Sequence, residues 1–306
     1  NLCSIDLSKA FDKVNHHALF IKLMNRYLPV CLLDLLEFWL SNSWSCIKWS
    51  DVYSPFFNIC FGVRQGSVLS PFLFAVYLND LVDGRYNGRY SFVILYADDI
   101  LILTSLLTEL QRLLHACEEE LAWLDMSINI SKSCCLRIGP RYDFKCYSIL
   151  TTNGLPLPWA TELRYLGVYI LSSRVFKCSQ DHAKRAYYRS LNAIFGKIGR
   201  SASEEVILQL VSSKCLPILL YASEACGLNQ SDIRSLDFVV NRFLMKLFKT
   251  ANLGVIQDCL SYFNFKLPSS LLVIRTHNFL AKYSNCENFI CKLFSNFNTA
   301  TRVHNV

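Results

Sequence analysis

The fold is decided by residues 92–103, FVILYADDILIL, in which two adjacent carboxylates, Asp98 and Asp99, stand between two uncharged apolar runs. Burying such charges is costly unless a cation or a polar partner compensates them. The flanking runs are short and rich in Ile, Leu and Val, which predicts two strands buried on both faces of a sheet. A tight hairpin would present both aspartates at its tip, and this arrangement indicates a divalent metal site.

The tetrapeptide from Tyr96 to Asp99 also fits a plainer alternative. Asp-Asp is common at solvent-exposed turns, because aspartate side chains bond the local backbone and tolerate turn conformations. Taken alone, so short a motif favours the exposed turn. The metal-site hypothesis therefore depends on what else the chain contains.

The composition indicates a folded protein with a basic surface. The chain has 306 residues, of which 52% are hydrophobic and 13% aromatic, so it can bury the core of one large domain or two smaller ones. Its net charge of +7, from 31 basic and 24 acidic residues, suits a polyanionic partner. The most apolar late segment, 206–228, contains Lys214, Pro217 and Glu224. These residues predict a buried helix rather than a membrane span, so no membrane partner is expected.

The 14 cysteines are irregularly spaced, and no C-x-x-C occurs among them. Most of them lie inside apolar runs, which predicts reduced core thiols in an intracellular protein. A zinc site built from Cys286, Cys291 and His304 is the less favoured alternative, because no clear tetrahedral set surrounds them.

Hydrophobic periodicity predicts an α+β part, residues 1–175, followed by an α-helical part, residues 176–306. Helices alone are predicted beyond Ser172, and the strands before it are expected to complete one sheet. The predicted strands are 2–7, a pair formed by 46–53 and 56–61, the hairpin 92–103, 134–138, and two more within 164–171. The predicted helices of the first part are 16–27, 30–40, 71–82 and 107–124.

Asp6 ends the first predicted strand, as Asp98 and Asp99 lie at the ends of theirs. Adjacent strands would therefore bring three carboxylates together. Two divalent ions about 4 Å apart, held by such carboxylates, are the usual device for in-line displacement at phosphorus. Ligands that are all oxygen favour Mg²⁺. For Asp6 alone, an N-cap on the segment that follows is an equally good interpretation.

Five segments occur in one order along the chain: SIDLSKAFDKV (4–14), GVRQGSVLSPFLF (62–74), YADD (96–99), INISKS (128–133) and YLGV (165–168). Together they closely resemble the reverse transcriptases of non-LTR, LINE-like retrotransposons, and the resemblance extends from residue 2 to about residue 250. The runs FDKVNH (11–16) and PILLY (217–221) look most like the jockey and chicken-repeat branches. Any one segment is a weak signal, whereas five in order are specific.

The resemblance implies a right-hand polymerase. Residues 1–175 would be the palm, an antiparallel sheet backed by helices with partial fingers, and residues 176–306 an α-helical thumb or connector. The implied function is an RNA-directed DNA polymerase that adds dNTPs to a DNA primer 3′ end on an RNA template. It would act inside the cell, in the nucleus at the site of integration.

The resemblance also implies the catalytic residues. Asp6 and Asp98 would be the principal ligands of two Mg²⁺ ions, for which Mn²⁺ can substitute, and Asp99 would be an auxiliary carboxylate. Lys132 matches the lysine that approaches the pyrophosphate and donates a proton to it. A solvated surface lysine is the alternative for Lys132.

Three further positions match the nucleotide-binding part of the family. Phe11 matches the aromatic gate that excludes a ribose 2′-hydroxyl, although a core phenylalanine on a short helix would look the same. Gln65 and Gly66 match the loop that contacts the incoming nucleotide and the template base, where glycine permits close backbone approach. Gly62 is assigned to the turn alone.

Two segments match the part of the family that binds primer and template. Tyr165, Leu166 and Gly167 belong to the hairpin that grips the primer end. The segment 174–200 carries seven basic residues against one acid, Asp181, and is predicted to contact phosphates through Lys184, Arg185 and Arg189 beside Tyr187 and Tyr188. A solvated helix face is the alternative. Asp12, His16, His17, Asp80 and Asp83 are assigned structural or solvent roles.

Two rival functions remain open. Members of the family carry fingers segments before the first aspartate strand, with basic residues that hold the triphosphate, and often an endonuclease further upstream. This sequence lacks both, so a truncated or decayed copy, catalytically silent and at most binding nucleic acid, is the main alternative. A metal-dependent nuclease using the same carboxylates is the second, and it leaves the glutamine loop, gate and thumb without a purpose.

Overall fold

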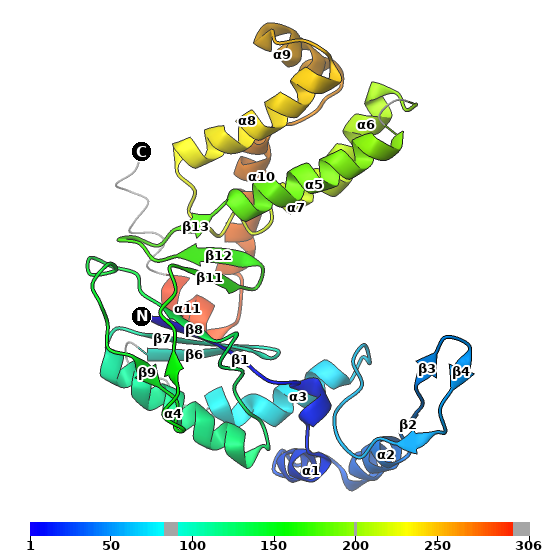
Figure 1. The fold of residues 1–306 in the computed structure, drawn as a ribbon, viewed down its shortest axis with the longest axis vertical. Helices are drawn as coiled ribbons and strands as arrows, with labels where there is room; N and C mark the ends of the chain where they lie inside the picture. The colour runs from blue at the N-terminus through cyan, green and yellow to red at the C-terminus, as the bar shows by residue number, and fades with distance from the viewer. Residues whose placement is uncertain (83–90, 199–200, 296–306) are drawn as a thin grey trace. The chain divides into compact units, whose positions relative to one another are not determined.

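The computed structural model describes residues 1–82, 91–198 and 201–295 (Figure 1), and the chain divides into two compact units. The first unit comprises residues 1–167 and 171–175, and the second comprises residues 168–170 and 176–306. Asp83, Arg200 and His304 lie outside the described residues.

The first unit is built on a four-stranded antiparallel sheet in the order β6-β7-β1-β8. Its strands are β1 (Leu2–Asp6), β6 (Ser91–Tyr96), β7 (Asp99–Thr104) and β8 (Cys134–Leu136). The apolar run 92–103 therefore forms the hairpin that its pattern predicts, and β1 lies along its second strand. Cys3, Ile5, Ile100 and Ile102, at alternate positions of β1 and β7, are fully buried. In β6 burial alternates, and Phe92, Ile94 and Leu95 are only half-buried, so the expectation that both strands are buried on both faces was wrong for β6.

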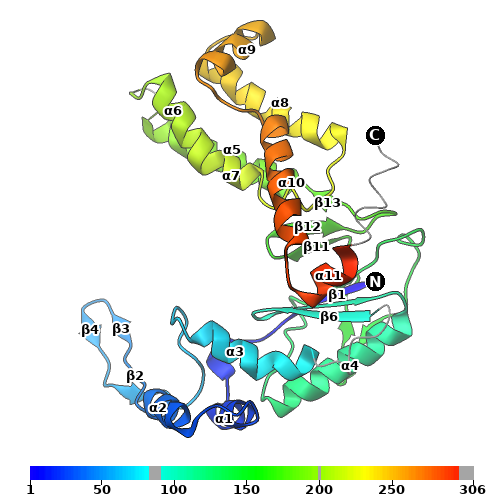
Figure 2. The ribbon, with the colours of Figure 1, turned by 180° about the vertical axis from the view of Figure 1, so that it is seen from behind.

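The helices of the first unit are α1 (His16–Met24), α2 (Val30–Ser41), α3 (Ser70–Leu78), its 3₁₀ continuation η2 (Asn79–Val82), and α4 (Leu107–Trp123). Of these, α4 packs on β7 and η2 on β6, whereas α1 packs on α3 and on α2. Figures 1 and 2 show α3 and α4 on the same side of the strands. The stripe of α4 formed by Leu110, Leu114, Cys117 and Leu121 is buried, as its helical spacing predicts. Lys22 is also buried; its ammonium lies 2.8 Å from Asp80, which has the predicted structural role.

The predicted strand pair 46–53 and 56–61 is wrong. Ser50 has a φ of +53°, and the chain turns back there, so β3 (Lys48–Trp49) pairs with β4 (Val52–Tyr53). The outer β2 (Trp44–Ser45) pairs with β5 (Phe57–Asn58). A two-residue turn inside an apolar run leaves little trace in the hydrophobic pattern, which explains the error.

The later strands also differ from the prediction. Neither β11 (Glu162–Tyr165) nor β12 (Val168–Leu171) belongs to the four-stranded sheet. An unpredicted pair, β9 (Ile149–Leu150) and β10 (Pro156–Leu157), follows β8. In the second unit β12 pairs with β13 (Cys178–Ser179), so the expectation that only helices follow Ser172 was wrong. Two-residue strands are too short to show a periodicity.

The second unit is otherwise helical: α5 (Asp181–Ile198), α6 (Glu204–Leu210), a π-helical turn η3 (Val211–Cys215), α7 (Leu216–Leu219), α8 (Gln230–Leu247), α9 (Leu253–Tyr262), α10 (Pro268–Ser284) and α11 (Phe289–Ser295). Its core contains the buried Tyr187, Leu219, Leu236 and Phe243. An ion pair between Arg275 and Glu224, at 3.1 Å, joins α10 to the segment before α8. Among the described residues, every helix is too short or too polar to cross a membrane.

The predicted α+β fold, an antiparallel sheet backed by helices and followed by a mainly helical part, is confirmed. All 14 cysteines are free thiols, as predicted, but only six are buried, so the description of them as core thiols was too broad. Cys286 and Cys291 are half-buried neighbours, and no group of three metal-ligating side chains occurs in the described part of the chain.

Candidate active site

The three predicted carboxylates lie at the same edge of the four-stranded sheet. Asp6 is the last residue of β1 and Asp99 the first of β7, and the two are direct partners in the antiparallel register. Asp98 precedes Asp99 in the two-residue turn that closes the hairpin, next to Ala97 with its φ of +51°. All three carboxylates are half-buried. The hairpin turn and the end of β1 therefore place acidic side chains from two separate segments side by side.

The carboxylates interact electrostatically. Burial raises the pKa of the Asp99 carboxyl, and the charges of Asp98 and Asp6 raise it further, against the opposing charge of Arg164. Mutual repulsion of this kind is what a bound cation would offset. The side chains offer only oxygen donors, which fits a hard cation such as Mg²⁺. As they stand, no three of the described acidic, histidine or cysteine side chains converge on a single point.

Lys132 lies beside the first carboxylate. Its ammonium is 3.8 Å from the Asp6 carboxylate, while 69% of the lysine side chain stays exposed. Residues 127–133 run along the end of β1: the backbone N–H of Asn129 donates to the Asp6 carbonyl at 2.8 Å, and the Asp6 N–H donates to Ser133 Oγ at 3.0 Å. Ser133 is 1% exposed and was missed from sequence, because a lone serine gives no signal of what it bonds.

Phe11 opens a short 3₁₀ helix, Phe11–Lys13, which follows β1. Its ring stacks on the buried ring of Phe74 in α3, with centroids 4.4 Å apart and planes 19° apart. Phe11 itself is only partly buried. Phe11 is thus packed on the core and partly open to solvent. Both the interpretation as an aromatic gate and the interpretation as a core phenylalanine remain open.

The glutamine loop is attached to the segment that carries Phe11. Gly62 N–H donates to the Val14 carbonyl at 2.8 Å, Val63 N–H donates to the Phe11 carbonyl at 2.8 Å, and His16 Nε2 lies 2.7 Å from the Gly62 carbonyl oxygen. A Cβ on Gly62 would lie 2.9 Å from the carbonyl oxygens of Phe11 and Asp12. Assigning Gly62 to a turn alone was therefore wrong, because it is the point of close contact between the two segments.

Gln65 and Gly66 lie on the exposed part of this loop. The Gln65 amide donates to the Asp12 carboxylate at 3.4 Å, and Gly66 has a φ of +86° with open space around its Cα. A cavity of about 500 Å³ adjoins Gln65, and Asp12, Trp39 and Arg64 are also among its lining residues. The loop thus presents the Gln65 amide and the Arg64 guanidinium to the cavity.

The YLGV segment forms a tight turn. Leu166 and Gly167 both have positive φ, +47° and +80°, and they connect β11 to β12. The Tyr165 hydroxyl is buried and lacks a hydrogen-bond partner among the described residues. Burial, and then the Asp99 charge, raises the pKa of Tyr165 to about 12. Tyr165 is therefore a neutral phenol beside the carboxylates.

The predicted phosphate-binding cations lie on α5, in the second unit. Arg185 and Arg189 are exposed one helical turn apart. Lys184 differs from the expectation: 22% of its side chain is exposed, and its ammonium bonds Ser235 Oγ at 2.8 Å and lies 3.9 Å from Asp181. Tyr187 is fully buried, so the expectation that it adds aromatic surface beside the arginines was wrong.

Several known proteins are similar to this chain in sequence. The chain is 28% identical to the RNA-directed DNA polymerase from mobile element jockey of Drosophila funebris over 242 residues, which cover 74% of the chain and 26% of that protein. It is 28% identical over 180 residues to the probable RNA-directed DNA polymerase from transposon X-element of Drosophila melanogaster, covering 56% and 19% of the two chains. The chain thus spans about a quarter of the length of such relatives, or less.

Among solved structures, the apo telomerase from Candida tropicalis truncated from its C-terminal domain matches with a TM-score of 0.45 and 14% identity, over 58% of this chain and 35% of that one. The family model described as reverse transcriptase (RNA-dependent DNA polymerase) matches residues 2–170. These residues contain all five ordered segments, and the resemblance to non-LTR retrotransposon enzymes is confirmed. The chain belongs to the reverse transcriptase family.

Proposed function

We propose that this chain is the polymerase domain of a non-LTR retrotransposon protein, which extends a DNA primer on an RNA template from dNTPs. The observation that carries the proposal is the register of Asp6 with Asp99, with Asp98 in the adjoining turn and Lys132 beside Asp6. A nuclease would need the carboxylates alone. The segments 6–14, 62–66 and 98–99, which carry Phe11, Gln65 and the carboxylates, adjoin one another, and this supports a polymerase over a nuclease.

Asp6, Asp98 and Asp99 would hold two Mg²⁺ ions, with Mn²⁺ as a substitute. When bound, such ions activate the attacking 3′-hydroxyl and stabilise the leaving pyrophosphate. The chain's own contribution is to hold the carboxylates at the sheet edge and to keep the Tyr165 phenol uncharged beside them. Arg185 and Arg189 would contact primer–template phosphates from α5, whereas Lys184 would do so only after leaving Ser235.

A primer-extension assay tests the proposal directly. The 306-residue chain, and a longer form carrying the upstream residues of its relatives, is incubated with a DNA primer annealed to RNA, all four dNTPs and Mg²⁺. Longer primers support the polymerase, and shortened strands support a nuclease. No product from either form, with EDTA as the blank, supports a silent remnant that at most binds nucleic acid.

Lys132→Ala is expected to lower the extension rate roughly 100-fold, because a positioned general acid typically contributes that much or more. The loss should appear in kcat rather than in KM for primer–template. Stability should hardly change, since the side chain is mostly exposed. Lys145→Ala, at another exposed lysine, is the control. Equal activity of the two variants would show that Lys132 is a solvated surface lysine without a role in catalysis.

Phe11→Val is expected to reduce discrimination against ribonucleotides at least tenfold, because less side chain then opposes a 2′-hydroxyl. It should also destabilise the protein by about 2 kcal/mol through the lost stacking on Phe74. The ratio of kcat/KM for dCTP and CTP measures the first effect and denaturant unfolding the second. Phe56→Ala, at a phenylalanine that is 72% exposed, should change neither. Unchanged discrimination in Phe11→Val would leave Phe11 a packing residue only.

A further inference from the structure

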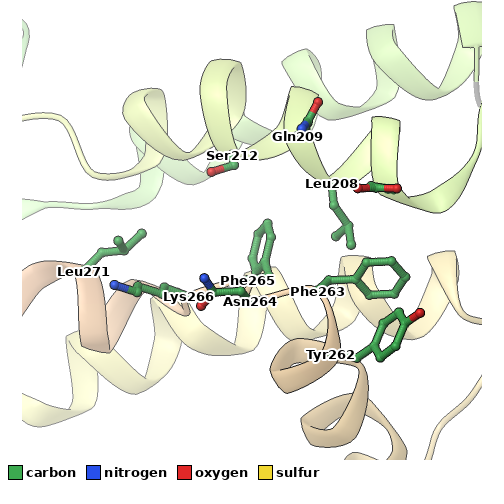
Figure 3. A pocket seen from close by; sticks show the side chains of 10 residues that line it. Leu208, Gln209, Ser212, Tyr262, Phe263, Asn264, Phe265, Lys266 and Leu271 are labelled. Atoms are coloured by element: carbon green, nitrogen blue, oxygen red, sulfur yellow. The ribbon is translucent and has the colours of Figure 1, made fainter.

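A second cavity, of about 570 Å³, lies wholly within the helical unit (Figure 3). One side comes from α6 and the π turn after it, with Glu205, Leu208, Gln209 and Ser212. The other side comes from the end of α9, the loop that follows and the start of α10, with Tyr262, Phe263, Asn264, Phe265, Lys266 and Leu271. Its size falls within the range of small-ligand sites, roughly 300–1,000 Å³.

The cavity is lined by both apolar and polar side chains. Leu208 is buried, and its side chain points toward the ring of Phe263 (Figure 3). Phe263 is fixed by stacking on Phe248, with ring centroids 5.8 Å apart. Gln209 and Asn264 supply amides that both donate and accept hydrogen bonds. A flat ring with donors and acceptors on its edge matches such a lining.

Tyr262 adds an exposed aromatic face. It is 84% exposed, and its ring is held edge-on against Phe263, with centroids 5.0 Å apart and planes at 86°. A large aromatic side chain kept in solvent but fixed by a neighbour is suited to stacking on a ligand ring. The charges of Glu205 and Lys266 balance each other, so the cavity itself does not attract phosphate.

We infer that this cavity takes an unpaired nucleobase of single-stranded RNA, with the base stacked on Tyr262 and its edge facing Gln209 and Asn264. RNA is the strand named by the family of this chain, and unpaired bases are recognised by aromatic stacking together with edge hydrogen bonds. The phosphates would remain outside the cavity. None of its lining residues is one of the three carboxylates or one of the exposed arginines of α5, and it needs neither metal nor dNTP.

The test compares two fluorescent single-stranded RNAs of about ten nucleotides, one intact and one abasic at every position, by anisotropy in EDTA. Both carry the same phosphates, so only base contacts separate them. The unaltered chain is expected to bind the intact RNA roughly tenfold more tightly. Tyr262→Ala and Gln209→Ala should reduce that ratio to threefold or less. Because EDTA and the absence of dNTPs prevent polymerisation, the result is independent of the proposed polymerase activity.

Two further variants make the test specific. Tyr262→Trp should keep the ratio, since indole also stacks on bases, and Val273→Ala, at a residue of α10 that is 72% exposed and outside the cavity, should keep it too. A full tenfold ratio in Tyr262→Ala would overturn the inference, because the base contacts would then lie elsewhere. Equal binding of both RNAs by the unaltered chain would also overturn it, because no base contact would then contribute to binding.

Discussion

Asp98→Ala is expected to abolish primer extension, with a rate reduced roughly 1,000-fold or more. Metal-held charge stabilisation contributes several kcal/mol to such a transition state, and about 1.4 kcal/mol corresponds to a factor of ten. Folding should not suffer, because Asp98 lies in a turn and its charge raises the pKa of Asp99. Removing that charge relieves repulsion. The measurements are primer extension with Mg²⁺ and a thermal melt of the metal-free protein.

The direction in which Asp98→Ala changes the melting temperature follows from the raised pKa of Asp99. A carboxyl whose folded-state pKa is raised contributes stability below its unfolded pKa, and loses that contribution as pH rises through the folded-state value. Near neutral pH the metal-free protein therefore bears the repulsion in full, so Asp98→Ala should melt at the same temperature or slightly higher. Added Mg²⁺ should raise the melting temperature of the unaltered chain and not that of the variant.

Asp51→Ala is the matched control, because Asp51 is an exposed aspartate in the β3–β4 turn, outside the carboxylate group. It should keep full activity. If Asp98→Ala extended primers normally, the metal assignment would be wrong. If it lost activity together with its folded structure, Asp98→Asn, which keeps the size of the side chain, would separate the two causes.

The sequence predicted the central hairpin and its neighbour because their signal is local. The run 92–103 carries its apolar strands and its acidic turn within twelve consecutive residues, and α4 shows four buried positions at helical spacing. That Asp6 would lie at the same edge followed from antiparallel pairing of β1 with β7. Periodicity thus predicted the acidic turn, whereas its meeting with Asp6 required β1 to be a neighbour of β7, which periodicity alone does not establish.

The remaining features of the site depend on contacts between distant segments. Ser133 acts through a hydrogen bond to the backbone of Asp6, 127 residues away, and Lys184 is withdrawn from the surface by Ser235, 51 residues away. Neither contact alters the local pattern of its own segment. The turn at Ser50 was missed for a local reason: the positive φ of this serine is not indicated by its residue type.

Gly62→Ala is expected to destabilise the protein by about 3 kcal/mol or more and to lower polymerase activity with it. Two causes add: a φ of +84° disfavours any side chain, and the new Cβ would meet backbone carbonyl oxygens of Phe11 and Asp12 at 2.9 Å. Backbone cannot move aside as a flexible side chain can. The loop must therefore separate from the segment that carries Phe11.

Gly66→Ala separates the two causes, because Gly66 has nearly the same φ, +86°, and no atom lies within 4 Å of the place that a Cβ would take. Its expected loss is about 1 kcal/mol, from backbone conformation alone. Denaturant unfolding of both variants gives the difference, and primer extension shows whether activity follows it. Equal losses of unfolding free energy in the two variants would mean that the close approach of Gly62 to residues 11 and 12 does not hold the glutamine loop. The loop would then not be fixed to the segment that carries Phe11.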